Sequence, residues 1–182
     1  TCALPISEIQ NKPGSKKIQW QGGIRFDNAS FTYKNTGIQA IKDFNLKIDR
    51  GDKVVIIGKT GSGKTTFAQL ILRLYDLQKG DILLDDISIT DIDLFSLRTA
   101  MSYVPQDVFL FSDTIYNNII FGKPDATREE VYNAAKNAGI FDEIMSFPQK
   151  FETILGERGI TISGGQKQRI SIARALIKNP QL

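Results

Sequence analysis

One stretch of the sequence, residues 58–65, restricts the possible folds more than any other. It reads GKTGSGKT and fills every fixed position of the pattern G-x-x-x-x-G-K-[ST]. Glycines allow backbone N–H groups to turn inward around an anion, and the helix that follows aims its N-terminal donors at the same place. The motif needs a strand before it and a helix after it. We therefore predict a buried strand over 54–58 and a helix over 67–77, as parts of an α/β fold.

The rest of the chain continues to mix strand and helix patterns. Alternating apolar residues predict strands over 24–33 and 38–48. A capping box between Thr127 and Glu130 begins a helix that stops at Gly139. The remaining predictions are strands over 81–86 and 101–105, a turn at Asp85–Asp86, and a helix that follows residue 163.

Composition excludes several classes of protein. The chain has 182 residues, of which 41% are hydrophobic and 24% are charged, so it is long enough for a domain with its own core. Its net charge of +3 is too small to indicate nucleic-acid binding. No apolar run approaches the roughly 20 residues that span a bilayer. Cys2 is the only cysteine and there is no histidine, which excludes a disulfide framework and the commonest acid–base side chain.

The glycine motif indicates a nucleoside triphosphate as the ligand. Lys64 is placed to reach the β- and γ-phosphates, and the Thr65 hydroxyl is placed to bind Mg²⁺. The candidate nucleotide-binding residues of the motif are Gly58, Thr60, Gly61, Ser62, Gly63, Lys64, Thr65 and Thr66. The motif by itself leaves kinases, GTPases and many ATPases possible.

A second glycine motif begins at Ser163. Ser163 and Gln166 have the spacing of a capping box, so one interpretation is a well-capped helix start and nothing more. The other interpretation is that Gly164 and Gly165 make a second helix N-terminus open to an anion. Two such termini in one chain suggest a nucleotide held between two surfaces.

At these residues the sequence resembles the ATP-binding cassette (ABC) family. Residues 162–166 read ISGGQ, where the family signature usually has leucine at the first position. Tyr33 has the spacing from the first glycine motif at which the family places an aromatic residue that stacks on adenine. Residues 103–111 match the family's Q-loop, with Gln106 as its glutamine, and residues 156–159 match a Gly-Glu-Arg-Gly run typical of exporters.

The resemblance implies a fold and a domain organisation. The fold would be the P-loop NTPase core of an ABC ATPase cassette, with an N-terminal antiparallel β part, an α-helical subdomain over about 107–175, and the C-terminal part of the core missing. Residues 24–182 would form this partial nucleotide-binding domain, and residues 8–23 would be a linker from a transmembrane domain. Residues 1–7 are expected to be a cloning or sequencing scar.

The resemblance also implies roles for single residues. ATP and Mg²⁺ would be the cofactors, with Lys64 and Gln106 as catalytic residues and with Thr65 and Gln106 as Mg²⁺ ligands. Tyr33 would stack on adenine. The signature residues would bind the ATP of the partner subunit in a head-to-tail dimer of two ABC nucleotide-binding domains, and these residues are Ser163, Gly164, Gly165 and Gln166.

The implied function is ATP binding and hydrolysis that powers substrate export across a membrane. The partner would be a transmembrane domain on the same parent chain, whose coupling helices meet the Q-loop and at least one of Phe109 and Phe111. The location would be the cytoplasmic face of the cell (inner) membrane, within an integral membrane transporter, and no nucleic acid is expected. The alternatives are a non-transporter ABC-type ATPase of DNA repair or chromosome maintenance, an importer or translation-associated cassette, and a non-catalytic nucleotide-binding cassette.

The family pattern continues past Leu182 with the Walker B aspartate and glutamate, a loop that communicates across the dimer, and a histidine. We therefore expect the 182-residue chain by itself to hydrolyse ATP negligibly, because the carboxylate that activates water is absent. We also expect it to fold poorly or to aggregate, because the strand beside residues 54–58 would be missing and an apolar edge would be open.

Overall fold

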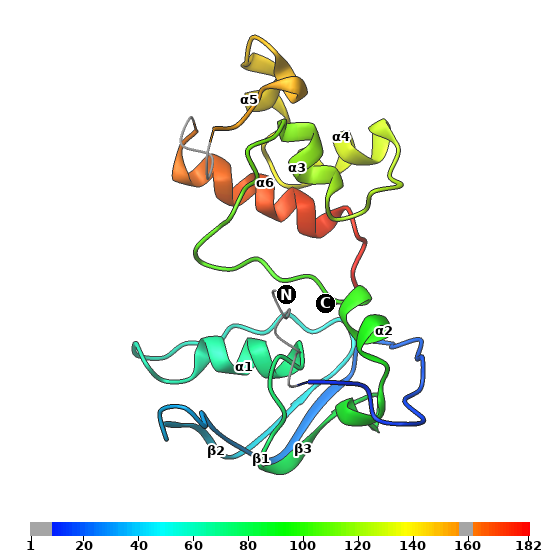
Figure 1. Ribbon diagram of the computed structural model, residues 1–182, viewed down its shortest axis with the longest axis vertical. Helices are drawn as coiled ribbons and strands as arrows, with labels where there is room; N and C mark the ends of the chain where they lie inside the picture. Colours follow the sequence, from blue (N-terminus) through cyan, green and yellow to red (C-terminus); the bar gives the residue numbers. More distant parts are fainter. Residues whose placement is uncertain (1–8, 157–161) are drawn as a thin grey trace, which may run out of the picture. The chain divides into compact units, whose positions relative to one another are not determined.

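The computed structural model describes residues 9–156 and 162–182, which fall into two compact units. The sheet unit is the described part of Thr1–Met101 together with Gln181–Leu182, and the helical unit is the described part of Ser102–Pro180. Figure 1 shows the strands and helix α1 of the first unit and helices α3 to α6 of the second. The predicted mixture of an antiparallel β part and helices is confirmed.

Four antiparallel strands form the sheet, in the order β2-β1-β3-β4. Their bounds are β1 Ile24–Thr32, β2 Gln39–Ile48, β3 Lys79–Leu84 and β4 Ile87–Ser88. Phe26 of β1 is buried and pairs with Leu46 on one side and with Ile82 on the other. Asp85 and Asp86 join β3 to β4 with positive φ angles of 47° and 65°, so the predicted turn is confirmed.

Helix α1 (Lys64–Ile71) follows the first glycine motif and packs on the sheet (Figure 1). Phe67 stacks on Phe26 of β1 with ring centroids 4.9 Å apart, and Leu70 is fully buried. This packing fixes the direction of the helix and, through it, the place of the glycine motif at its N-terminus.

Arg73 ends this helix earlier than predicted, since the sequence pattern placed the end at Leu77. The φ angle of Arg73 is 46°, a left-handed conformation that a right-handed helix cannot continue. Its guanidinium is buried and donates to Asp76 Oδ1 at 2.9 Å and to the carbonyl oxygen of Gln10 at 3.3 Å. The ion pair and the carbonyl make it possible to bury this charge, and they hold the helix end in place.

The segment before β1 is hydrogen-bonded to the two short helices that follow β4. These helices are η1 Ile89–Asp91 and α2 Leu94–Thr99. The Asn11 side chain donates to Asp93 Oδ2 at 2.6 Å and accepts from the N–H of Leu94 at 2.7 Å. The backbone carbonyl oxygen of Lys16 accepts from the N–H of Asp93 at 2.9 Å. The Trp20 side chain is buried. The polar composition of this segment gave no sign of these contacts.

Two predicted strands are wrong. Residues 54–58 and 101–105 have no strand structure, and no described strand pairs with either of them. Val55 and Ile57 are 80% and 91% exposed. A parallel strand is stable only when neighbours on both sides take its hydrogen bonds and cover its side chains. The β-branched run over 54–58 has the composition of such a strand and lacks those neighbours within the described residues.

Five helical segments form the second unit around a core of its own. Their bounds are α3 Ile115–Ile120, α4 Arg128–Asn137, α5 Phe141–Ser146, η2 Lys150–Glu152 and α6 Gly164–Leu176. Helices α3 and α4 both pack on α6, and the buried side chains between them include Ile119, Val131 and Ile170. Among the described residues, no helix has the length and apolar composition needed to cross a bilayer.

The start of α4 is a complete capping box, as predicted. The Thr127 side chain accepts from the N–H of Glu130, and the Glu130 side chain accepts from the N–H of Thr127. Lys123 Nζ lies 2.6 Å from Glu130 Oε1, and this bond, together with the Thr127 N–H, lowers the pKa of Glu130 from 4.5 to about 2. Gly139 follows the helix with a φ of 66°, so the predicted stop is also confirmed.

The exposed run over 54–57 generates a first prediction. The 182-residue chain should aggregate and should enhance the fluorescence of an apolar dye, because four adjacent apolar side chains face water. The variant V55S/I57S should scatter less light at the same concentration and bind less dye. Ile38→Ser is the matched control, since Ile38 is a single exposed isoleucine of the same unit. Equal scattering by all three proteins would contradict the prediction.

The depressed pKa of Glu130 generates a second prediction. A carboxyl whose pKa is lower in the folded state stabilises the fold above its unfolded pKa of 4.5, and this stabilisation is lost as the pH falls toward 2. In the V55S/I57S background, E130Q keeps a cap acceptor and loses the charge. Its melting temperature should lie below that of the parent at pH 6, and the two curves should converge near pH 2. A constant difference from pH 6 to pH 2 would contradict the assignment.

Candidate functional site

The first glycine motif forms a tight turn that leads directly into α1. Gly61 and Gly63 have φ angles of 81° and 84°, and Gly63 is the N-cap of the helix. A Cβ atom on Gly63 would lie 2.6 Å from the carbonyl oxygen of Ala40 on β2. Glycine is therefore required here both by the backbone angle and by the close approach of a strand.

The Lys64 ammonium lies inside the turn that precedes it. Its Nζ donates to the carbonyl oxygens of Gly58 at 2.8 Å and Lys59 at 2.7 Å, and it lies 3.4 Å from the Ser62 hydroxyl. The loop is thus curled around a positive charge at the N-terminus of a helix. Both the charge and the helix dipole favour an anion at this place.

The two threonines after Lys64 differ in their surroundings. Thr65 is exposed at the start of α1, so its hydroxyl is open to a ligand. Thr66 is only 5% exposed, and its hydroxyl is 2.9 Å from the hydroxyl of Tyr33. The Tyr33 hydroxyl also donates to Gln69 Oε1 at 3.2 Å. These bonds attach Tyr33 to the glycine-motif helix, which the sequence spacing alone did not indicate.

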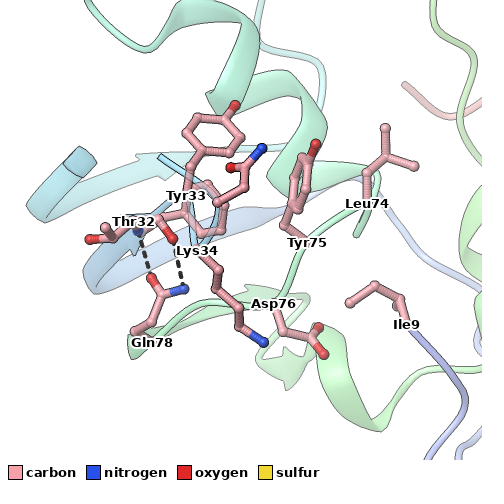
Figure 2. Close-up of a pocket in the computed structure, with 10 residues that line it drawn as sticks. Ile9, Thr32, Tyr33, Lys34, Leu74, Tyr75, Asp76 and Gln78 are labelled. Atoms are coloured by element: carbon pink, nitrogen blue, oxygen red, sulfur yellow. Dashed lines mark hydrogen bonds between the residues drawn. The ribbon is translucent and has the colours of Figure 1, made fainter. Parts of the chain in front are cut away.

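Tyr33 also forms part of an aromatic cavity of about 500 Å³ (Figure 2). Its ring makes edge contacts with Phe31 at 4.9 Å and with Tyr75 at 5.4 Å between centroids. The cavity is lined by Ile9, Phe31, Thr32, Tyr33, Lys34, Asn35, Leu74, Tyr75, Asp76 and Gln78. Tyr75 was missed at the sequence level because it lies in a segment predicted as helix, whereas the early end of α1 turns it toward Tyr33.

The second glycine motif begins α6 in the helical unit. Ser163 is the N-cap, its hydroxyl accepts from the N–H of Gln166 at 3.2 Å, and its own N–H donates to Gln166 Oε1 at 2.9 Å. The capping box predicted here is confirmed. Added Cβ atoms on Gly164 and Gly165 would meet no described atom within 4 Å, so internal packing does not require glycine at either position. Glycine at these positions leaves the backbone N–H groups of the helix start uncovered by side chains of their own.

The remaining candidate residues are distributed over both units. Gln106 is exposed in a non-helical segment of the helical unit, whereas Lys64 and Thr65 belong to the sheet unit. Glu157 and Arg158 of the Gly-Glu-Arg-Gly run lie outside the described residues. No group of three or more His, Cys, Asp or Glu side chains suited to a metal occurs in the described part of the chain. Of the two residues predicted from the sequence to bind Mg²⁺, Thr65 lies in the sheet unit and Gln106 in the helical unit.

An aromatic patch, defined here as Phe109, Phe111 and Phe121, lies exposed on the helical unit. Phe109 and Phe121 are 54% and 60% exposed, and Phe111 contacts both rings, with centroids 5.2 and 4.7 Å away. The Arg174 guanidinium lies 5.4 Å from the Phe111 ring centre and donates to the carbonyl oxygens of Phe109 and Asn118. Burial lowers the pKa of Arg174. Phe121 and Arg174 were not predicted, because their sequence neighbours match no motif.

Comparison with known proteins places these features in a family. The family described as "ABC transporter" matches residues 41–182. The chain is 49% identical over 173 residues to the "Putative multidrug export ATP-binding/permease protein YgaD" of Bacillus subtilis, covering 94% of this chain and 30% of the relative. It is 46% identical over 176 residues to a Staphylococcus aureus protein with the same description, SAV1866, again covering 30% of the relative.

A solved structure gives the same result at the level of the fold. The structure of a bacterial Atm1-family ABC exporter with ATP bound superposes with a TM-score of 0.91 at 41% sequence identity, over 95% of this chain and 30% of the exporter chain. The chain therefore spans about a third of the length of the relatives it matches. Since the family match covers most of its residues, the chain belongs to the ABC transporter family.

Proposed function

We propose that this chain is the ATP-binding and ATP-hydrolysing part of an ABC exporter. The observation that carries the proposal is the glycine-rich turn curled around the Lys64 ammonium at the N-terminus of α1. A triphosphate placed there would meet a fixed cation, backbone N–H groups and a helix dipole. Tyr33, which is hydrogen-bonded to the same helix, presents its ring for the base.

The reaction would be ATP + H₂O → ADP + phosphate. Lys64 would lie against the β- and γ-phosphates and would stabilise the negative charge that develops on them. The exposed Thr65 hydroxyl and the Gln106 side chain would hold Mg²⁺, which neutralises charge on the phosphate oxygens when bound.

The second half of each site would come from a second copy of the domain. Ser163 and Gly165 of one copy would contact the nucleotide bound at Lys64 of the other, in a head-to-tail C₂ dimer. The surroundings of Gly164 and Gly165 support this arrangement, since added Cβ atoms there would meet no atom of the described residues within 4 Å. Nucleotide binding would then join the two copies, and hydrolysis would release them.

The exporter assignment rests on the relatives. Their printed names combine an ATP-binding part with a permease, and this chain covers only 30% of their length. The membrane-spanning part would therefore belong to the same parent protein, and the domain would work at the cytoplasmic face of the membrane. The aromatic patch is the surface of the helical unit best suited to receive a membrane-domain helix.

Lys64→Ala tests the nucleotide site in the complete exporter. Loss of the ammonium should weaken MgATP binding at least about tenfold, because a hydrogen bond to a charged group contributes about 1.5–3 kcal/mol. Binding is measured with a fluorescent ATP analogue, and ATPase activity should fall in parallel. Lys53→Ala is the control, since Lys53 is an exposed lysine just before the motif. Unchanged affinity in the Lys64 variant would refute the site.

The isolated 182-residue chain should show almost no ATPase activity. Lys64 and Thr65 would bind the phosphates, but the Walker B carboxylates that the family pattern places after Leu182 are not among its residues. General-base catalysis contributes on the order of 10²–10⁴ in rate, so turnover should fall by that factor relative to the complete exporter. A phosphate-release assay on both proteins measures this ratio, and a ratio near one would contradict the prediction.

A further inference from the structure

A carboxylate on α5 is bound to two side chains at the start of α6. Glu143 Oε2 accepts from Gln166 Nε2 at 3.0 Å, and Glu143 Oε1 accepts from Arg169 Nη2 at 2.5 Å. The three side chains are partly buried within the helical unit. No motif in the sequence includes Glu143, which lies in the short helix α5, 23 residues before Gln166.

This carboxylate determines which way the Gln166 amide faces. A glutamine side chain has one oxygen that accepts and one NH₂ group that donates. Because Glu143 can only accept, it takes the NH₂ end, and the oxygen end is left to accept from the N–H of Ser163 at 2.9 Å. The reversed amide would place an oxygen against the carboxylate and an NH₂ against the Ser163 N–H. Glu143 therefore excludes the orientation that breaks the capping box.

The amide orientation in turn fixes Ser163. The Ser163 N–H is bonded to Gln166 Oε1, and the Ser163 hydroxyl accepts from the Gln166 N–H, so both groups of the serine are held by one residue. Added Cβ atoms on Gly164 and Gly165 would meet no atom of the described residues within 4 Å. Glu143 thus acts on the turn through Gln166.

The negative charge of Glu143, near the N-terminus of α6, also requires a compensating positive charge. A free carboxylate near the N-terminus of α6 would repel an anionic ligand that approaches Gly164 and Gly165. Arg169 Nη2 donates to Glu143 Oε1 at 2.5 Å and neutralises its charge, while the Arg169 Nε atom is buried without a partner among the described residues. The ion pair supports Gln166 and adds no net charge near the turn.

We propose that Glu143 is a positioning residue for the nucleotide sandwich: it locks Gln166, and through it Ser163, in the geometry that meets the phosphates of a nucleotide bound by a second copy. This inference rests on the proposed function, because it presumes that Ser163 meets such a nucleotide. It predicts that Glu143 affects the catalytic step and leaves the first encounter of nucleotide with the Lys64 turn unchanged.

The test uses the complete exporter with Glu143→Ala, Glu143→Gln and the control Asp142→Ala. Asp142 is the adjacent, exposed acid of the same helix, and no described bond joins it to α6. E143A should lower kcat about tenfold, a typical effect for residues that orient a ligand-binding group, while binding of a fluorescent ATP analogue stays within about twofold. E143Q should lie between the parent and E143A, because its single acceptor cannot serve both Gln166 and Arg169. D142A should match the parent.

A double variant separates positioning from a merely structural role. If Glu143 acts through Gln166, E143A/Q166A should have the same kcat as Q166A alone. Full additivity of the two losses would overturn the proposal, as would an E143Q variant with the melting temperature and kcat of the parent. If the parent itself neither binds nor hydrolyses MgATP, the proposed function fails and this inference fails with it. Parent-like kcat in the Glu143 variants beside an inactive Lys64→Ala variant would overturn the inference alone.

Discussion

The hydrogen bonds of the Lys64 ammonium are the interaction on which the nucleotide site depends. Two carbonyl oxygens of the preceding turn accept from Nζ, and these bonds draw residues 58–63 into a closed loop. The loop can close because Gly61 and Gly63 adopt left-handed angles, and the close approach of strand β2 leaves no room for a Cβ on Gly63. The packing of Phe67 on the sheet then fixes the helix that carries the lysine. The position of Lys64 therefore depends on the packing of α1 on the sheet, and the conformation of the loop depends on the hydrogen bonds of the Lys64 ammonium.

Both glycine motifs lie at the N-terminus of a helix, and different interactions hold each one in place. In the sheet unit the helix N-terminus is occupied by a lysine of its own loop, so the positive charge is built in. In the helical unit the N-terminus is held by a capping box whose amide is oriented by Glu143. One half is suited to bind a triphosphate by charge, and the other to recognise it by shape and N–H groups. This difference agrees with a sandwich in which nucleotide binds to the first half before the second closes on it.

Local patterns in the sequence predicted local structure well. The capping boxes at Thr127 and Ser163 and the turn at Asp85–Asp86 depend on neighbouring residues only, and all three were predicted correctly. The strand over 54–58 failed because a strand needs partners, and partners are not encoded in the run itself. The predicted end of α1 was wrong because Arg73 adopts a left-handed φ of 46° and buries its side chain, which donates to Asp76 and to the carbonyl oxygen of Gln10.

The residues of the candidate site also differ in how well the sequence predicted them. The motif residues were identified from spacing, whereas the side chains that support them from elsewhere in the chain were not. Tyr75 beside Tyr33 and Glu143 behind Gln166 come from segments without a motif, so only the fold brings them into contact. Such supporting residues have to be read from the structure, and they decide how rigidly the motif residues are held.

The central claim is that the Lys64 ammonium directly contacts the phosphate oxygens of a nucleotide bound at the glycine-rich turn. Solid-state NMR that measures dipolar coupling between the ¹⁵N-labelled Lys64 side chain and ³¹P of bound ATP, in the complete exporter, tests it directly. The account predicts a coupling that corresponds to direct contact, of about 3–4 Å between nitrogen and phosphorus, and its loss in Lys64→Arg labelled in the same way. Bound ATP with no coupling between Lys64 Nζ and any phosphorus would contradict it.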